Sequence, residues 1–213
     1  ESGWNREAGI RFLSRNNRLQ IDGSIFRFDL NNAIVRRTNE NDEEYFLNAG
    51  GTNQTGTEFL IHAWAIPLSE FGVIRGLELN ASFTYNHFVF DQYQDATSDY
   101  SGNSLTGVPK TVGILGVTVY LPKHISVFVQ SNMTSRLPLN DANSQYAEKY
   151  NLLQARLLWR VLQTAKLKFE IFAGGDNLLN EKYSLGNDIN AFGGRYYNAA
   201  PLRNFYGGLS ITL

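Results

Sequence analysis

The sequence predicts an all-β protein, an antiparallel transmembrane β-barrel segment of about nine strands. Three observations lead to this prediction. Apolar and polar residues alternate with a period of two in many segments. Short and long connections between these segments alternate along the whole chain. The composition also favours strands, because 14 Phe and 11 Tyr accompany only 5 Pro.

The alternation is clearest in residues 77–86. One face of this segment carries apolar or aromatic side chains and the other carries polar ones. The apolar set is Leu77, Leu79, Ala81, Phe83 and Tyr85, and the polar set is Glu78, Asn80, Ser82, Thr84 and Asn86. A strand of a soluble sandwich would alternate in the same way, so this pattern alone does not identify a membrane protein.

Residues 24–32, 152–161, 166–173 and 202–213 repeat the pattern. Their apolar sets are Phe26, Phe28 and Leu30; Leu153, Ala155, Leu157, Trp159 and Val161; Leu167, Phe169 and Ile171; and Phe205, Leu209, Ile211 and Leu213. In a membrane barrel these sets are expected to face the lipid, with the polar sets facing the lumen.

The connections distinguish a membrane barrel from a sandwich, because a membrane barrel has short turns on one side only. The shorter connections are residues 15–18, 67–76, 121–124 and 162–165, and the long polar ones are residues 37–44, 91–106, 137–148 and 181–198. If the C-terminus is periplasmic, all long loops face outside, and the first strand, about residues 4–13, descends like the last.

The strand number carries a further expectation. Bacterial single-chain barrels have an even number of strands, and nine is odd. We therefore expect residues 1–213 to be a single segment of a larger barrel, with its upstream strands absent. Its last strand should then either close artificially against residues 4–13 or leave an exposed seam.

Composition and motifs argue against several other functions. The net charge of −1 gives no basis for nucleic-acid binding. Cysteine is absent, which excludes disulfides and Cys-ligated metal. His62, His87 and His124 lack the spacing of metal ligands, and by parity His62 faces the lumen with Glu58 while His87 faces outward. We therefore expect no cofactor, no metal site, no catalytic residue and no enzymatic activity.

Five local strings occur in an informative order. They are Asn48-Ala-Gly50 followed by Gly56-Thr-Glu58, Leu79-Asn-Ala-Ser-Phe-Thr-Tyr85, Val108-Pro-Lys110, Asn177-Leu-Leu-Asn-Glu-Lys-Tyr183 and Pro201-Leu-Arg-Asn-Phe-Tyr-Gly207. Together they resemble the C-terminal barrel portion of TonB-dependent outer-membrane receptors, over about residues 4–213. The chain departs from that pattern at Leu178-Leu179, where an aromatic residue is usual, at Thr57 in place of Val, and at Leu213 in place of Phe.

This resemblance implies a barrel of about 22 strands with a plugged lumen. It also implies active uptake of a scarce nutrient across the bacterial outer membrane: a ferric siderophore, haem, cobalamin or a carbohydrate. The implied partners are outer-membrane lipid, the extracellular nutrient, and a plug domain and TonB that would act through an upstream region. The segment alone should not transport. Two alternatives remain open, a small outer-membrane barrel with a structural, adhesive or passive-pore role and an outer-membrane hydrolase.

Two groups of residues are candidates, one for an architectural role and one for ligand contact. The motif residues are expected to be architectural, because such motifs occur at barrel rims and bends: Asn48, Gly50, Gly56, Glu58, Pro109, Asn177, Tyr183, Pro201 and Arg203. The loop residues are candidates for ligand contact: Tyr93, Tyr100, Tyr146, Tyr150, Arg195, Tyr196 and Tyr197. An interfacial girdle or simple loop packing would also explain these loop aromatics, and the girdle or wall is expected for Trp4, Trp64 and Trp159.

Overall fold

A computed structural model describes residues 1–39, 41, 43–48, 50–94 and 98–213, with only the backbone described at 35–38 and 47. Within these residues nine strands form one antiparallel sheet in sequence order, which confirms the expected fold class. The strands are β1 (Ser2–Leu13), β2 (Leu19–Asn31), β5 (Gly51–Ile66), β6 (Gly76–Phe90), β7 (Thr111–Leu121), β8 (Ile125–Thr134), β11 (Tyr150–Gln163), β12 (Lys168–Asp176) and β13 (Asn204–Thr212).

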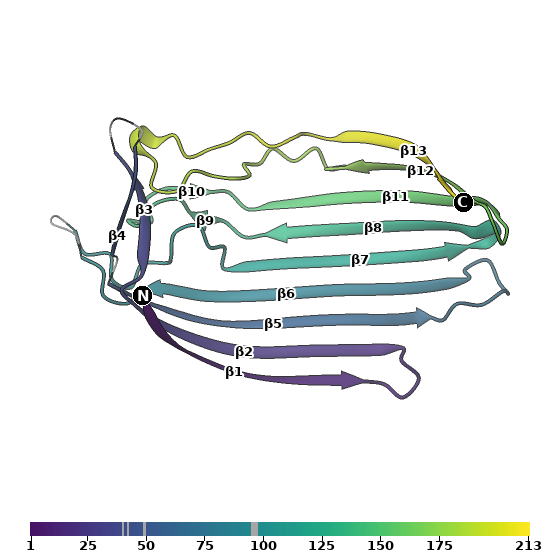
Figure 1. Ribbon diagram of the computed structural model, residues 1–213, viewed down its shortest axis with the longest axis horizontal. Helices are drawn as coiled ribbons and strands as arrows, with labels where there is room; N and C mark the ends of the chain where they lie inside the picture. Colours follow the sequence, from purple (N-terminus) through teal and green to yellow (C-terminus); the bar gives the residue numbers. More distant parts are fainter. Residues whose placement is uncertain (40, 42, 49, 95–97) are drawn as a thin grey trace.

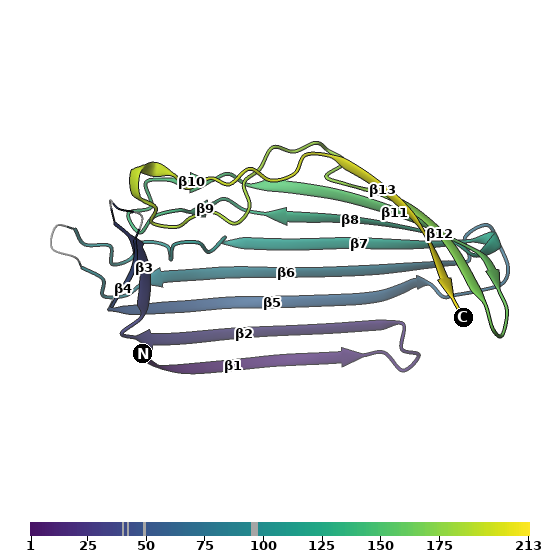
Figure 2. The same ribbon diagram turned by 45° about the horizontal axis from the view of Figure 1, so that its top comes forward.

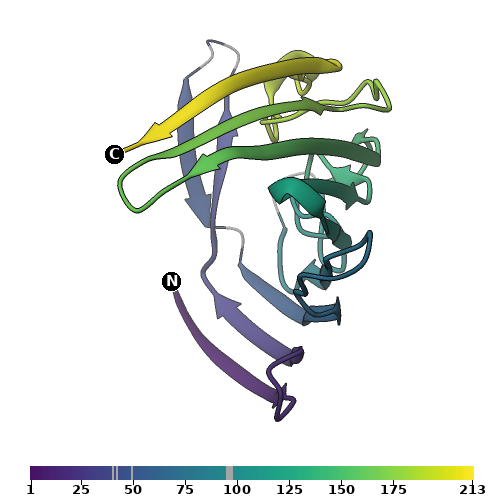
Figure 3. The same ribbon diagram turned by 90° about the vertical axis from the view of Figure 1, so that its right-hand side faces the viewer.

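The sheet is curved but not closed. Figure 3 shows a trough in which β1 and β13 form the two free edges. Of the two outcomes expected for the last strand, the exposed seam is therefore confirmed. Artificial closure against residues 4–13 is wrong, because β1 pairs only with β2 in the described part of the chain.

The connections separate to the two ends of the sheet, as the sequence predicts (Figures 1 and 2). We call these the short-turn end and the long-loop end. The connection from β2 to β5 contains a hairpin of β3 (Ile34–Thr38) and β4 (Glu44–Asn48), which runs across the ends of the main strands. The connection from β8 to β11 contains β9 (Leu137–Pro138) and β10 (Tyr146–Ala147).

Local chemistry explains why a short turn forms between β1 and β2. The hydroxyl of Ser14 accepts hydrogen bonds from the backbone N–H groups of Arg18 at 3.1 Å and Leu19 at 2.9 Å. Asn17 has a φ of 55°, in the left-handed region that asparagine tolerates better than most residues. Polar turn residues therefore satisfy the backbone groups at this end of the hairpin.

The strand register aligns side chains of one kind into transverse rows, because paired residues lie on the same face of a sheet. One outer row runs from Ile10 through Gly23 and Phe59 to Phe83. Further along the sheet, the outer sets of β11, β12 and β13 meet in the row Trp159, Ile171 and Leu209. Ile10 is 74% exposed and Leu209 is 66% exposed. The outer face of the sheet is therefore an apolar surface towards the short-turn end.

The same register corrects the expected orientation of one apolar set. Phe26 pairs with Gly56, and Phe28 pairs with Gln54, which places both on the inner face with Leu30. Phe26 packs edge-on against Phe88 with ring centroids 6.0 Å apart. The expectation that this set faces lipid is wrong, because alternation shows which residues share a face but does not say which face is inside.

This inner apolar surface continues into the loops above it. Ala33, Phe90 and Tyr93 are buried there, and Leu30, Tyr100 and Leu105 pack against them. The ring of Tyr93 lies 4.8 Å from that of Phe90 and 5.2 Å from that of Tyr100. The long-loop end therefore has a small hydrophobic core on the concave side of the sheet.

The first motif string crosses the boundary between two strands. Asn48 ends β4, Gly50 has a φ of 71°, and β5 begins only at Gly51. A Cβ at Gly50 would lie 1.5 Å from the backbone oxygen of Gln92, so the close approach of the next loop requires glycine here. Ala49, the middle residue of the string, lies outside the described residues.

Candidate functional site

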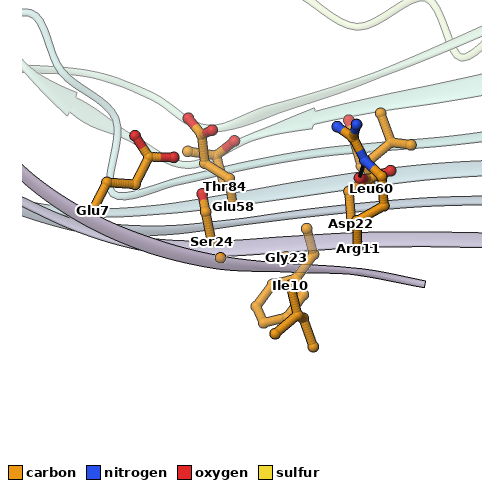
Figure 4. A pocket seen from close by; sticks show the side chains of 12 residues that line it. Glu7, Ile10, Arg11, Asp22, Gly23, Ser24, Glu58, Leu60 and Thr84 are labelled. Atoms are coloured by element: carbon orange, nitrogen blue, oxygen red, sulfur yellow. Dashed lines mark hydrogen bonds and ion pairs between the residues drawn. The ribbon is translucent and has the colours of Figure 1, made fainter.

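The inner face of β1, β2, β5 and β6 carries a cavity of about 520 Å³. Figure 4 shows Glu7, Ser24, Glu58 and Thr84 projecting to the same side, into the trough, whereas Ile10 points to the opposite side. Towards the short-turn end of this cavity Arg11 forms an ion pair with Asp22. Carboxylates and hydroxyls from four neighbouring strands thus line this cavity beside apolar side chains.

A second inner cluster lies nearer the short-turn end. The His62 Nε2 atom is 3.0 Å from one carboxylate oxygen of Glu78, and the Tyr120 hydroxyl donates to the other at 3.1 Å. The Trp64 ring stacks on Tyr120 with centroids 5.7 Å apart. Trp64 is therefore a wall residue on the inner face, whereas Trp4 and Trp159 lie on the outer face.

His62 and His87 lie on opposite faces of the sheet, as parity predicts. His62 pairs with Asn80 on the inner face, and His87 pairs with Thr55 on the outer face. Their rings therefore cannot share a site across the wall. Among the described residues no three His, Asp or Glu side chains gather in a group that could hold a metal ion.

Basic residues dominate the inner face at the other side of the trough. Glu170 is nearly buried and accepts from Arg160 Nε at 3.0 Å and from Lys168 Nζ at 2.9 Å. The guanidinium of Arg156 lies over the Phe172 ring, 4.7 Å from its centroid. The inner face is therefore acidic on β1 to β6 and basic on β11 and β12. Such a face is complementary to a polar protein surface that carries the opposite charges.

The loop residues that the sequence offers as candidates for ligand contact lie in separate parts of the long-loop end. Tyr93 is 1% exposed and packs with Tyr100, which is the loop-packing role left open by the sequence. Tyr150 packs against Tyr183 with ring centroids 4.9 Å apart. Ligand contact by these residues stays a prediction.

The remaining candidates gather between two loops. The Arg136 guanidinium lies 4.5 Å from the centroid of the Tyr146 ring, and the Tyr197 hydroxyl donates to the backbone oxygen of Tyr146 at 3.0 Å. Tyr196 and Tyr197 are in edge contact at 6.4 Å. Nearby, Arg195 Nε donates to the backbone oxygen of Phe192 at 3.4 Å. Tyr197 is 54% exposed, so this cluster offers an accessible aromatic surface at the long-loop end.

Sequence reasoning missed the residue that ties three loops together. Asp141 is 1% exposed, and its carboxylate accepts from the Thr106 hydroxyl and from Asn190 Nδ2 at 3.0 Å. Its backbone oxygen accepts from Asn103 Nδ2 at 2.8 Å. The loops after β6, β8 and β12 are therefore joined through one buried carboxylate. An Asp in a polar loop gives no local signal of such a role.

The loop after β6 also contains an exposed carboxylate that accepts hydrogen bonds from two neighbouring residues. Asp99 accepts from the Ser101 backbone N–H at 2.9 Å and from Gln94 Nε2 at 3.0 Å. Hydrogen bonds from Ser101 and then from Gln94 hold the pKa of the Asp99 carboxyl below its ordinary value.

The motif residues near the end of the chain make contacts within the chain. The Asn177 side chain accepts from the Glu181 N–H at 2.8 Å and donates to the backbone oxygens of Glu181 at 2.9 Å and Pro201 at 3.3 Å. Arg203 Nη1 donates to the backbone oxygen of Leu178 at 3.4 Å. These bonds hold the loop after β12 against the start of β13.

Other motif residues shape the wall. A Cβ at Gly56 would lie 2.4 Å from the Phe26 ring, so glycine makes room for an inward-facing aromatic. Glu58 projects into the cavity on the inner face of β1 to β6 (Figure 4). The Pro109 backbone oxygen accepts from Asn86 Nδ2 at 3.1 Å. An architectural role of these residues stays a prediction.

An antiparallel sheet with an apolar outer face, a polar inner face and long loops at one end is the wall of a membrane β-barrel. A family model for the TonB-dependent receptor-like β-barrel matches residues 1–178. The chain therefore belongs to the TonB-dependent receptor β-barrel family. Among the described residues no helix is long and apolar enough to cross a membrane.

Solved structures share this fold at low sequence identity. The siderophore receptor PiuA from Acinetobacter baumannii is 17% identical with a TM-score of 0.73, and the match covers 99% of this chain and 28% of PiuA. The ferric citrate transporter FecA is 18% identical with a TM-score of 0.77, covering 99% and 31%. The copper transporter OprC is 15% identical with a TM-score of 0.68, covering 99% and 31%. The chain thus spans less than a third of the length of these proteins.

Proposed function

We propose that this chain forms the C-terminal part of the barrel wall of an outer-membrane receptor that takes up a scarce nutrient with energy from TonB. The observation that supports this most strongly is the family match over residues 1–178. The two free edges agree with it, because an unpaired strand edge cannot face lipid and needs further strands to complete a barrel.

The polar inner face supports a plugged lumen. Carboxylates on β1 to β6 and basic groups on β11 and β12 provide a charged lining for a polar domain inside the barrel. We propose that the same receptor has a plug domain and that its partner TonB acts through sequence outside this segment. The segment alone is not expected to transport.

The long-loop end is the proposed extracellular face. Tyr146, Tyr196 and Tyr197 gather there with Arg136, and aromatic and guanidinium groups are favoured at recognition surfaces. A metal chelate is the favoured nutrient class, because PiuA and FecA are described as a siderophore receptor and a ferric citrate transporter, and OprC as a copper transporter. Haem, cobalamin and carbohydrates remain in the proposed range.

The proposal is tested in two stages with the native protein. Cell fractionation should recover it in the outer membrane, and it should migrate on gels in a heat-modifiable way. Recovery in a soluble fraction would refute the membrane assignment. Uptake of a radiolabelled ferric siderophore should then depend on the gene and on TonB. Uptake that persists without TonB would instead favour a passive pore.

A further inference from the structure

Two arginines stand where the outer face changes from apolar to polar. The register pairs Arg6 of β1 with Arg27 of β2, one row beyond the pair of Ala8 and Ile25. Neighbouring strands are about 4.8 Å apart, so the two guanidinium groups can reach one anion. Both residues are exposed, and the Arg27 side chain is 52% exposed.

The surface on the short-turn side of this pair is apolar. Ile25 is 59% exposed, Ile10 is 74% exposed, and Phe59 is 48% exposed, all on the outer face. Successive rows on one face lie about 6.7 Å apart along the strands. The arginines therefore lie at the border of a surface that fits acyl chains.

The surface on the long-loop side has the character of a membrane interface. Trp4 pairs with Asp29 in the next outer row, and its side chain is 73% exposed. Tryptophan is enriched at the level of lipid headgroups. Asp29 accepts from Arg27 Nε at 3.0 and 3.2 Å, and because both contacts use Nε, the terminal nitrogens of Arg27 can still bind another acceptor.

We propose that Arg6 and Arg27 bind the phosphate of a phosphorylated lipid in the outer leaflet. Guanidinium groups bind phosphate through paired, charge-assisted hydrogen bonds. A shallow cavity of about 320 Å³ at this place is lined by both arginines, by the apolar residues Ala8, Ile25 and Phe26, and by Glu7 and Thr55. Continuity between this cavity and the apolar surface favours a lipid over free phosphate. The inference rests on the proposed membrane location.

The test uses the native full-length protein in detergent and native mass spectrometry. Dioleoyl phosphatidic acid is compared with dioleoylglycerol, which has the same acyl chains and no phosphate. We expect the protein to bind phosphatidic acid on the order of tenfold more tightly. The double variant R6S/R27S should lose most of this preference.

The matched control is R15S/R18S, which removes the same charge from the β1–β2 turn at the opposite end of the hairpin. It should keep the preference for phosphatidic acid. An equal loss in both double variants, or no loss in R6S/R27S, would overturn the proposal. Displacement of the lipid by an equal concentration of inorganic phosphate would also overturn it, because the site would then bind free phosphate.

A second measurement does not depend on any variant. Raising the ionic strength from about 0.05 to about 0.5 M should screen exposed charges. The preference of the wild-type protein for phosphatidic acid over dioleoylglycerol should therefore fall several-fold. A preference that does not change with salt would count against the arginines. A native protein recovered in the soluble fraction would refute the proposed function, whereas a membrane-embedded, heat-modifiable barrel without lipid preference would refute only this inference.

Discussion

The two halves of the barrel wall have opposite polarity. Towards the short-turn end, the outer face carries residues such as Ile10 and Phe59, and the inner face carries Glu58 and Glu78. Towards the long-loop end of β2 and β6, aromatic residues lie inside, and Arg27 and His87 lie outside. The fold is the same in both halves, so this polarity follows the surroundings of each face and not the backbone.

Strand length explains why both halves exist in one sheet. β5 has 16 residues, which at about 3.3 Å per residue exceeds the roughly 25 Å apolar band of a membrane barrel. The part beyond the band faces water outside and packs against loops inside. Substitutions that are costly in one half should therefore be mild in the other.

The largest effect is expected for F90A in the loop core. Phe90 is 1% exposed, and removing a buried Phe side chain costs about 3–5 kcal/mol. Chemical unfolding in detergent would measure the change. F71A is the control, because Phe71 is 84% exposed and its loss should change little. An equal effect of both variants would show that the long-loop half has no packed core.

The next effect tests the outer face of the short-turn half. Leu115 is 49% exposed in the apolar band, and arginine at the middle of a bilayer costs roughly 2–4 kcal/mol. L115R should lower the free energy of unfolding in lipid vesicles by this amount. H87R, at an exposed position on the outer face of the other half, should cost about 0–1 kcal/mol. Similar costs at both positions would place the boundary between the halves elsewhere.

A smaller effect is expected for the junction of the three loops. D141A removes the acceptor of Thr106 and Asn190, which should cost about 1–3 kcal/mol, because buried donors lose their partner. Hydrogen exchange should rise in the loops after β6 and β12. D188A removes an exposed Asp from the same loop layer as a control. Unchanged exchange in D141A would mean that the loops are held independently of one another.

The smallest effect is a pH dependence confined to the loop after β6. The folded-state pKa of Asp99 is lowered, so its contribution to loop order is present above the unfolded value of about 3.9. That contribution is lost as pH falls through the lower folded value. Hydrogen exchange at Ser101 should increase only in strong acid, and D99N should show the increase at every pH. Identical pH profiles for both proteins would contradict this assignment.

The sequence was sufficient for features with local causes. Period-two alternation and polar turn residues such as Ser14 and Asn17 act within a few residues, so the nine strands and the alternating connections were predictable. The inward orientation of Phe26 was not, because it depends on pairing with Gly56, 30 residues later. Asp141 escaped for the same reason, since its partners lie in loops distant in the chain. Gly50 was expected to be architectural, but the Gln92 backbone that requires glycine there could not be predicted.

The order of the strands also has a consequence for assembly. Every pairing in the main sheet joins strands that follow one another among its members, from β1 to β13. Each new strand therefore closes only a loop of local length, and the entropy of closure grows slowly with that length. The sheet can extend hairpin by hairpin, which keeps the contact order of each step low and favours rapid growth from whichever hairpin forms first.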